Sequence, residues 1–250
     1  SYGWMIFDAK SLKLKRKFAF KNKIHNLKNI FQSSKGDIFL LTGVDGVIYH
    51  LSDFESQPTL IRSVSTSLVS QLVQYQTLVL GGNNTGIVKF DGNSFDLLKT
   101  TPSSVLSMAT VGDLLYVGME DGIGIYNEKG DFKVLDISTL PSNSVNSILQ
   151  AKDKDYLWLG TNAGFCYYNI PENRVEFSVY TNDGLPGNEI VTNGLLLNKK
   201  GVLYVATFHG VSSFDLKKEN SEKFVPQCRL ENILLNGLPF DLSRNKFNYS

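Results

Sequence analysis

The sequence has few of the residues that build disulfide frameworks, metal centres or membrane spans. Its 250 residues include two cysteines and three histidines. Cys166 and Cys228 are too few for a disulfide framework and lack zinc-type spacing, so we expect both to be small buried residues. The histidines, at positions 25, 50 and 209, lie far apart along the chain, so we expect no metal and no cofactor. No apolar run approaches the ~20 residues that a membrane-spanning helix needs.

An excess of charge of one sign is also lacking. The chain carries 25 basic and 24 acidic residues, a formal net charge of +1. A nucleic-acid-binding protein usually has a strongly basic face, so we expect no nucleic-acid partner. The chain begins at Ser1 without an initiator Met or a signal peptide and soon enters a strand-like run. We therefore expect a piece of a longer polypeptide, in which missing targeting segments do not indicate location.

What the sequence does have is a set of strand-forming residues arranged in repeats. Apolar residues make up 42%, and the 16 Phe and 11 Tyr favour β-strands. A loop glycine recurs at a spacing of about forty residues, which is typical of propeller blades, each a four-stranded sheet. The recurring glycines are Gly46, Gly86, Gly122, Gly164 and Gly210.

Each repeat has the same order of parts, best seen in the fourth. An apolar run, Val145–Leu149, is followed by a polar turn and by Leu157–Leu159, which is apolar on both faces and therefore covered on both. A loop ends in Gly164, and a more polar run, Val175–Tyr180, closes the unit. The sequence predicts an all-β fold, a β-propeller of about five four-stranded blades plus part of another, followed by the start of a β-sandwich.

The repeat pattern also sets the expected domain boundaries. We expect blades at 24–66, 67–103, 104–143 and 144–188, with the last blade and a linker at 189–225. Residues 1–23 fit the outer strands of a preceding blade, although they could instead complete the last blade. Residues 226–250, which read as strand, Asn236-Gly237 turn and strand, fit a truncated β-sandwich.

Candidate ligand-binding residues follow from strand direction. In an antiparallel blade, the loop between the second and third strands lies on the same face as the connection to the next blade. Short polar side chains gathered around a central depression suit sugar hydroxyls, although the same residue types are ordinary in tight turns. The candidates are Asn83, Asn84, Glu120, Asp121, Asn162, Phe208 and His209, with Phe208-His209 the least turn-like pair.

Three other motifs resemble functional sites but have a simpler interpretation. Trp158 lies in the middle of a run that is apolar on both faces, which favours packing between blades over sugar stacking. His50-Leu51-Ser52-Asp53 has the residue types of a triad but no nucleophile turn. Gly81–Gly86 lacks the lysine and helix of a phosphate loop. We therefore predict no catalytic residues.

The fourth repeat resembles a known family, the two-component regulator propeller repeat. The resemblance rests on Leu157-Trp158-Leu159-Gly160-Thr161 together with Asn182-Asp183-Gly184-Leu185-Pro186. The other repeats keep the skeleton but replace Trp158 by Phe39, Val79, Tyr116 or Tyr204. The tail from Val225 to Phe247 is similar to the opening of the β-sandwich that follows these propellers.

This resemblance implies the periplasmic sensor domain of a hybrid two-component system histidine kinase. Members of the family lie ahead of a membrane helix and a cytoplasmic kinase, and many respond to oligosaccharides. The implied partners are an oligosaccharide ligand and a second copy of the full-length protein, with membrane contact only through segments outside this chain. The implied role is non-enzymatic.

Two alternatives stay open at this point. Streptogramin lyases are similar propellers, and a lyase would need a His and a Glu together on the central face. Only His209 and Glu120 could serve, and they lie two blades apart. A propeller can also be a platform for protein interactions alone.

Overall fold

The computed structural model describes residues 3–19, 27–42, 47–54, 56, 58–62, 69–217, 234–235 and 238–239. The chain divides into two units, Ser1–Lys217 and Lys218–Ser250. In the second unit, β22 (Leu234–Leu235) pairs with β23 (Leu238–Pro239), and these strands flank the predicted Asn-Gly turn. The predicted β-sandwich over 226–250 otherwise falls outside the described residues, as does Cys228.

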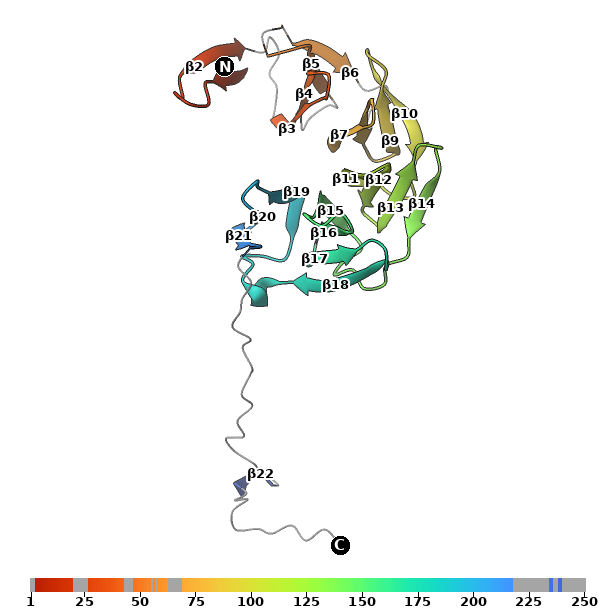
Figure 1. The fold of residues 1–250 in the computed structure, drawn as a ribbon, viewed down its shortest axis with the longest axis vertical. Helices are drawn as coiled ribbons and strands as arrows, with labels where there is room; N and C mark the ends of the chain where they lie inside the picture. The colour runs from red at the N-terminus through yellow and green to blue at the C-terminus, as the bar shows by residue number, and fades with distance from the viewer. Residues whose placement is uncertain are drawn as a thin grey trace. The chain divides into compact units, whose positions relative to one another are not determined.

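The first unit is built from five blades (Figure 1). Blade 1 holds β3 (Leu27–Gln32), β4 (Ile38–Thr42), β5 (Val47–Leu51) and β6 (Thr59–Arg62). Blade 2 holds β7 (Gln71–Tyr75), β8 (Leu78–Gly82), β9 (Gly86–Phe90) and β10 (Phe95–Thr100). Blade 3 holds β11 (Val105–Val111), β12 (Leu114–Met119), β13 (Ile123–Asn127) and β14 (Phe132–Leu135).

The last two blades complete the array. Blade 4 holds β15 (Val145–Gln150), β16 (Tyr156–Thr161), β17 (Gly164–Asn169) and β18 (Arg174–Val179). Blade 5 holds β19 (Ile190–Leu197), β20 (Val202–Thr207) and β21 (Gly210–Asp215), with no fourth strand among the described residues. Neighbouring strands pair antiparallel in sequence order, which confirms the predicted all-β propeller of four-stranded blades.

Residues ahead of blade 1 form a separate two-stranded sheet of β1 (Gly3–Phe7) and β2 (Leu14–Ala19). Ile6 of β1 packs against Ile38, Leu40 and Leu51 of blade 1. Among the described strands, neither β1 nor β2 pairs with β21 of the last blade. The assignment of residues 1–23 to a preceding blade stays a prediction.

The hydrophobic core lies between successive blades rather than inside any one of them. One buried cluster joins Leu80 of blade 2 to Leu115 of blade 3, and another joins Tyr116 of blade 3 to Leu157 of blade 4. Trp158 of blade 4 belongs to a cluster with Ile190 and Leu203 of blade 5 and is 6% exposed. The interpretation of Trp158 as packing between blades is therefore confirmed.

In blades 2, 3 and 4 a glycine near the end of the second strand allows the next blade to come close. A Cβ added to Gly82 would lie 2.3 Å from Cγ1 of Val105, and one added to Gly160 would lie 2.7 Å from Cγ2 of Ile190. Val105 and Ile190 are the first residues of the inner strands of the following blades. Glycine is needed at these positions because the side chain of the next inner strand's first residue fills the space that a Cβ would take.

Hydrogen bonds also join successive blades near the first residues of their inner strands. Ser70 Oγ donates to the Val105 carbonyl oxygen at 2.8 Å, and Ser107 Oγ donates to that of Val145 at 2.9 Å. Between blades 4 and 5 the corresponding donor is the Asn146 amide, whose Nδ2 lies 2.8 Å from the Ile190 carbonyl oxygen. Each bond satisfies a carbonyl group at the start of an inner strand, where an unpaired buried acceptor would be costly.

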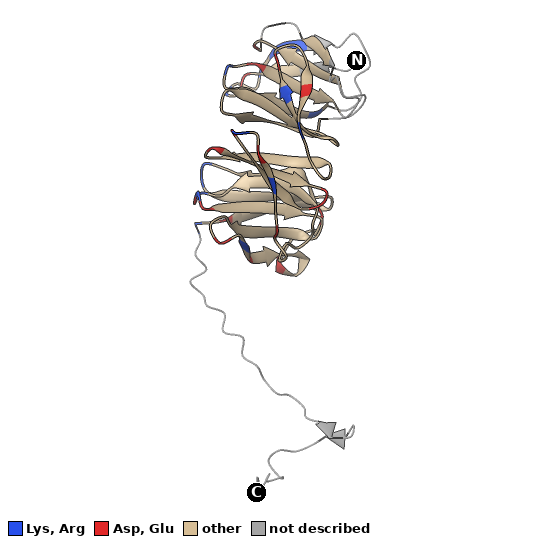
Figure 2. Ribbon diagram, turned by 90° about the vertical axis from the view of Figure 1, so that its right-hand side faces the viewer, with Lys and Arg blue, Asp and Glu red and all other residues tan. Residues whose placement is uncertain are grey.

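Charged residues lie at turns and at exposed or partly exposed strand positions (Figure 2), and no charged side chain among the described residues is buried. Three of the four ion pairs present among the described residues join exposed or partly exposed side chains within a single turn or hairpin. In the described part of the chain, no helix is long and apolar enough to cross a membrane.

The contact between Gly160 and Ile190 can be tested by a double-mutant cycle that measures the free energy of unfolding. Gly160→Ala should cost about 1–3 kcal/mol in the free energy of unfolding, because its methyl group overlaps Ile190. Ile190→Ala alone should cost about 2–5 kcal/mol through the cavity it leaves. Together they should cost less than the sum by about 1 kcal/mol, since the new methyl enters that cavity. Urea denaturation measures all four proteins, and strict additivity would contradict the contact.

The buried cysteine makes a second prediction. Cys166 is free and 0% exposed, and burial raises the pKa of its thiol to about 12. Because the thiolate is the reactive form, Cys166 should resist alkylation by iodoacetamide at pH 8 until the protein unfolds. The Cys228→Ser variant isolates Cys166, and mass spectrometry in buffer and in urea measures the modification. Rapid alkylation of the folded variant would show that this side chain is accessible.

Candidate functional site

The loops between second and third strands meet the connections between blades at one face, as predicted. The Gly122 amide donates to the Asn143 carbonyl oxygen at 2.7 Å, and the Gly164 amide donates to that of Asn188 at 2.6 Å. Asn143 and Asn188 belong to the connections that follow β14 and β18. Backbone hydrogen bonds therefore hold the two kinds of loop together, and we call this side of the propeller the central face.

A depression of about 380 Å³ opens on the central face across blades 3, 4 and 5. Its volume lies at the lower end of the range of about 300–1,000 Å³ that is typical of small-ligand sites. Three of the seven predicted ligand-binding residues lie in it. The residues that form it are Leu106, Glu120, Ser144, Asn146, Asn162, Glu189, Ile190, Thr192 and Phe208.

Each of the three blades supplies this depression from two equivalent positions. One is the first loop residue after the second strand, which is Glu120, Asn162 or Phe208. The other lies in a β-bulge near the start of the inner strand, which holds Leu106, Asn146 or Thr192. A bulge inserts an unpaired residue and re-aims its side chain, so these residues leave the sheet pattern and reach the central face.

The bulge differs in size between blades. In blades 3 and 4 one extra residue separates the paired positions, Val105 from Ser107 and Val145 from Ser147. In blade 5 the paired positions Ile190 and Leu195 enclose four residues, against one on the partner strand. Asn193 within this bulge has a φ of 57°, a left-handed conformation that asparagine tolerates better than most residues.

A hydrogen-bond network fixes the floor of the depression. Asn146 Nδ2 donates to the Asn162 side-chain oxygen at 2.6 Å and to the Ile190 carbonyl oxygen at 2.8 Å. Asn146 Oδ1 accepts from Ser144 Oγ at 3.1 Å. Asn146 is 8% exposed and fully engaged, so its role is to hold Asn162 in place and to join blades 4 and 5. Asn162 is exposed, and its side-chain NH2 group can donate hydrogen bonds to a ligand.

The rest of the depression combines acidic groups with one exposed ring. The side chains of Glu120 and Glu189 are both exposed there, and no basic residue is among the groups that form it. Phe208 is 68% exposed, more than any other aromatic side chain that the structure describes. The site therefore offers carboxylate and amide groups beside an apolar surface.

Two of the predicted residues lie in blade 2, outside the depression. Asn83 is 1% exposed, and its side-chain oxygen accepts from the amides of Thr85 and Gly86, each at 2.9 Å. That arrangement closes the turn between β8 and β9 and makes Asn83 a structural residue. Asn84 is exposed but does not line the depression.

Asp121 and His209 are the second residues of the loops that follow β12 and β20, and neither lines the depression. Asp121 accepts a hydrogen bond from Asn143 Nδ2 at 3.0 Å, which ties the loop to the next connection. The ring of His209 lies over Gly187, where an added Cβ would come within 2.6 Å of Nδ1.

The residues absent from the sequence-based prediction are those of the bulges and the connections. Asn146, Thr192 and Glu189 lie in runs that read as strand or connection, where a polar residue gives no distinct signal. A break in alternation could have revealed the bulge, because the apolar residues Val145 and Ile148 stand three positions apart and yet lie in one buried cluster.

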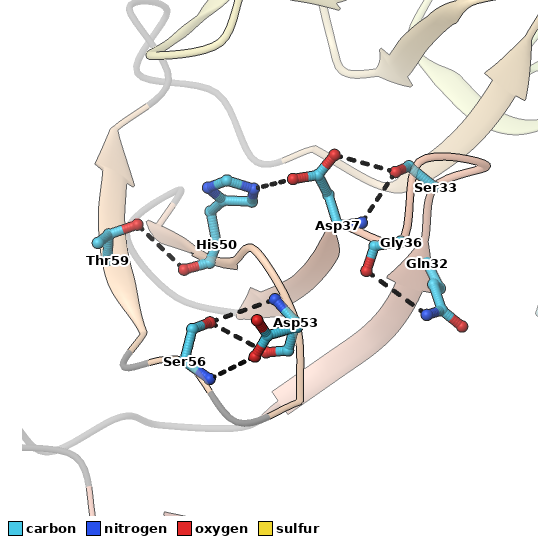
Figure 3. Close-up of polar contacts among 8 residues, drawn as sticks. All are labelled: Gln32, Ser33, Gly36, Asp37, His50, Asp53, Ser56 and Thr59. Atoms are coloured by element: carbon cyan, nitrogen blue, oxygen red, sulfur yellow. Dashed lines mark hydrogen bonds and ion pairs between the residues drawn. The ribbon is translucent and has the colours of Figure 1, made fainter.

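A second polar cluster lies in blade 1 (Figure 3). His50 Nε2 lies 2.8 Å from Asp37 Oδ1, and Ser33 Oγ donates to Asp37 Oδ2 at 3.2 Å. In a catalytic triad the histidine stands between the acid and the hydroxyl, whereas here the acid stands between the other two. Ser33 thus has no base beside it, and the cluster closes the turn between β3 and β4.

Comparisons with known proteins identify the repeat. Residues 139–163 match the model of the family described as "Two component regulator propeller". The predicted two-component regulator propeller repeat is therefore confirmed in the region that carries Trp158 and Gly160. Among curated proteins, none matches the sequence.

Solved structures share the fold at low sequence identity. The chain superposes on the extracellular domain of a hybrid two-component system from B. thetaiotaomicron with a TM-score of 0.71 and 13% identity, covering 96% of this chain and 36% of that one. A second such domain from B. thetaiotaomicron superposes with a TM-score of 0.60 at 19% identity, covering 78% of this chain and 28% of that one. A streptogramin B lyase superposes with a TM-score of 0.60 at 15% identity, covering 80% of this chain and 72% of that one. The chain thus spans about a third of the two-component ectodomains it matches.

The Asn146 network makes a prediction about stability. Asn146→Ala removes three hydrogen bonds, among them the bond donated to the buried Ile190 carbonyl oxygen, and should cost about 1–3 kcal/mol in the free energy of unfolding. The matched control is Asn143→Ala, which removes one exposed hydrogen bond and should cost about 0.5 kcal/mol or less. Urea denaturation measures both, and equal losses would show that Asn146 does not join the blades.

Proposed function

We propose that this chain, whose fourth blade carries a two-component regulator propeller repeat, is a sensor module from the periplasmic ectodomain of a hybrid two-component histidine kinase. We further propose that it binds an oligosaccharide at the depression on the central face and that the kinase lies in another part of the protein. The fold shared with two extracellular domains of such systems supports the sensor role. The depression across blades 3, 4 and 5 is the observation that carries the ligand proposal.

The chemistry of the depression favours a neutral sugar. Asn162 can donate to a hydroxyl group, and the carboxylates of Glu120 and Glu189 can accept from others. The exposed ring of Phe208 offers a surface for the apolar face of a sugar ring. Two carboxylates without a nearby basic residue would repel an acidic sugar, so the proposed ligand carries no charge.

The same geometry suggests how binding could be relayed. The depression draws residues from three successive blades, so a bound sugar would alter how they pack. A ligand shifts a conformational equilibrium only if it binds the two conformations unequally. In the full-length protein we propose that a second copy receives this change across a dimer and passes it to the kinase through a membrane segment outside this chain.

A lyase is the second candidate, favoured by the fold shared with streptogramin B lyase. It would require Glu120 and His209 to act on one substrate. Glu120 lines the depression, but His209 packs over Gly187 and does not. We therefore propose a non-enzymatic role. Turnover of a streptogramin by the chain, lost in His209→Ala, would establish the lyase instead.

Calorimetry tests the ligand proposal. A panel of neutral oligosaccharides should contain one that binds the chain, and Asn162→Ala or Phe208→Ala should weaken it by about tenfold, or about 1.4 kcal/mol. Asn84→Ala is the matched control, an exposed asparagine on the equivalent loop of blade 2, and should leave the affinity unchanged. Circular dichroism shows that the variants fold.

Two results would contradict this proposal. If the chain and the intact ectodomain both gave no heat with any member of the panel, direct sugar sensing would be wrong. A pull-down that recovered a protein partner in the same conditions would then favour an interaction platform. If a sugar bound equally well to Asn162→Ala and Phe208→Ala, its site would lie away from the depression.

A further inference from the structure

A larger groove of about 620 Å³ lies between blades 4 and 5, at the opposite ends of the strands from the central face. It is formed by the turn between β15 and β16, the turn between β19 and β20, and the end of β21. No residue of the depression contributes to it. The residues that form it are Ala151, Lys152, Asp153, Trp158, Tyr167, Phe177, Leu197, Asn198, Lys199, Gly201, Leu216 and Lys217.

One wall of the groove is a row of aromatic rings across blade 4. Trp158 pairs with Tyr167 in the neighbouring strand, and Tyr167 pairs with Phe177 in the next. The ring centroids of Trp158 and Tyr167 are 4.4 Å apart, and those of Tyr167 and Phe177 are 5.4 Å apart. Phe177 is 48% exposed, so the outer end of the row presents an aromatic surface to the groove.

Trp158 leaves a hydrogen-bond donor unused. Its Nε1 is buried and has no hydrogen-bond partner among the described residues. It is the one buried side-chain nitrogen or oxygen in the described part of the chain for which this holds. A buried donor without an acceptor costs free energy, and this indole N–H lies in a residue that lines the groove, so its NMR signal should report on a ligand bound there.

The rim of the groove is basic. Lys152, Lys199 and Lys217 all line it, and they face a single acidic residue, Asp153. The three lysines come from the two turns and from the end of β21, so the fold, rather than one run of sequence, brings them together. The aliphatic part of Lys217 lies over Gly201, where an added Cβ would come within 3.2 Å of its Cε.

We propose that this groove binds a small aromatic carboxylate. The ring of the ligand packs on Phe177 and Tyr167, and its carboxylate pairs with the lysines of the rim. Offset stacking and charge-assisted hydrogen bonds are the two interactions that this set of residues can supply. The site differs in charge from the acidic depression on the central face, so the two would take different ligands.

NMR and calorimetry with a simple probe test this site. The chain has two tryptophans, so the Trp4→Phe variant leaves Trp158 as the sole source of an indole N–H signal. Addition of 3-phenylpropionate should shift that signal, and the acid should bind about tenfold more tightly than the neutral 3-phenylpropanol. Phe177→Ala should weaken the binding of 3-phenylpropionate by about tenfold, because the ring on which the ligand packs is lost.

Matched variants separate charge from packing. Replacing Lys152, Lys199 and Lys217 together by Gln should abolish the preference for the acid, and Lys133→Gln, an exposed lysine of blade 3, should leave it unchanged. Trp158→Phe removes ring volume from the buried cluster with Ile190 and Leu203, so it should lower the urea midpoint of the free protein. It should leave the preference for the acid over the alcohol in place, because the rim lysines supply that preference.

The proposal is overturned by any of three results. No binding of 3-phenylpropionate would show that the groove takes no such ligand, and equal binding of the acid and the alcohol would show that the lysines do not recognise charge. Tighter binding of glucuronate than of 3-phenylpropionate would show that the groove prefers an acidic sugar to an aromatic acid.

Discussion

The close approach of successive inner strands is the constraint on which this propeller depends. Gly82 and Gly160 stand where the first inner-strand residue of the next blade must pack, and a Cβ at either would overlap Val105 or Ile190. Buried apolar clusters fill the space between the blades that meet at these glycines. Hydrogen bonds from Ser70, Ser107 and Asn146 then satisfy the carbonyl groups that this approach buries.

The same contact places the candidate site. In blades 3, 4 and 5 the sheet has a bulge immediately after the first residue of the inner strand, and the bulged residue turns toward the central face. Between blades 4 and 5, Asn146 combines both roles, since one amide nitrogen joins the blades and fixes Asn162. A ligand that bound Asn162 would therefore act, through one hydrogen bond, on the Asn146 amide that joins blades 4 and 5. In a sensor, such a contact would couple ligand binding to the packing of the two blades.

Much of the fold could be predicted from the sequence because blades repeat. The recurring glycines and the two-sided apolar runs identify the second strands, and they place Trp158 in the core. The site was harder to predict because it depends on register and on the direction of single side chains. Phe208 and His209 are neighbours in the sequence, yet one lines the depression and the other packs on Gly187. Asn146 was missed because a bulge is a property of two paired strands, not of one run of residues.

The central claim is that the bulges and loops of blades 3, 4 and 5 form one site for a neutral oligosaccharide. The most direct measurement is a 1H–15N NMR titration of the chain with a sugar that binds it. The account predicts that the side-chain amide signals of Asn162 and Asn146 shift together with the backbone signals of Glu120 and Phe208, while that of Asn84 stays in place. Shifts confined to blades 1 and 2, or to the groove beside Phe177, would contradict it.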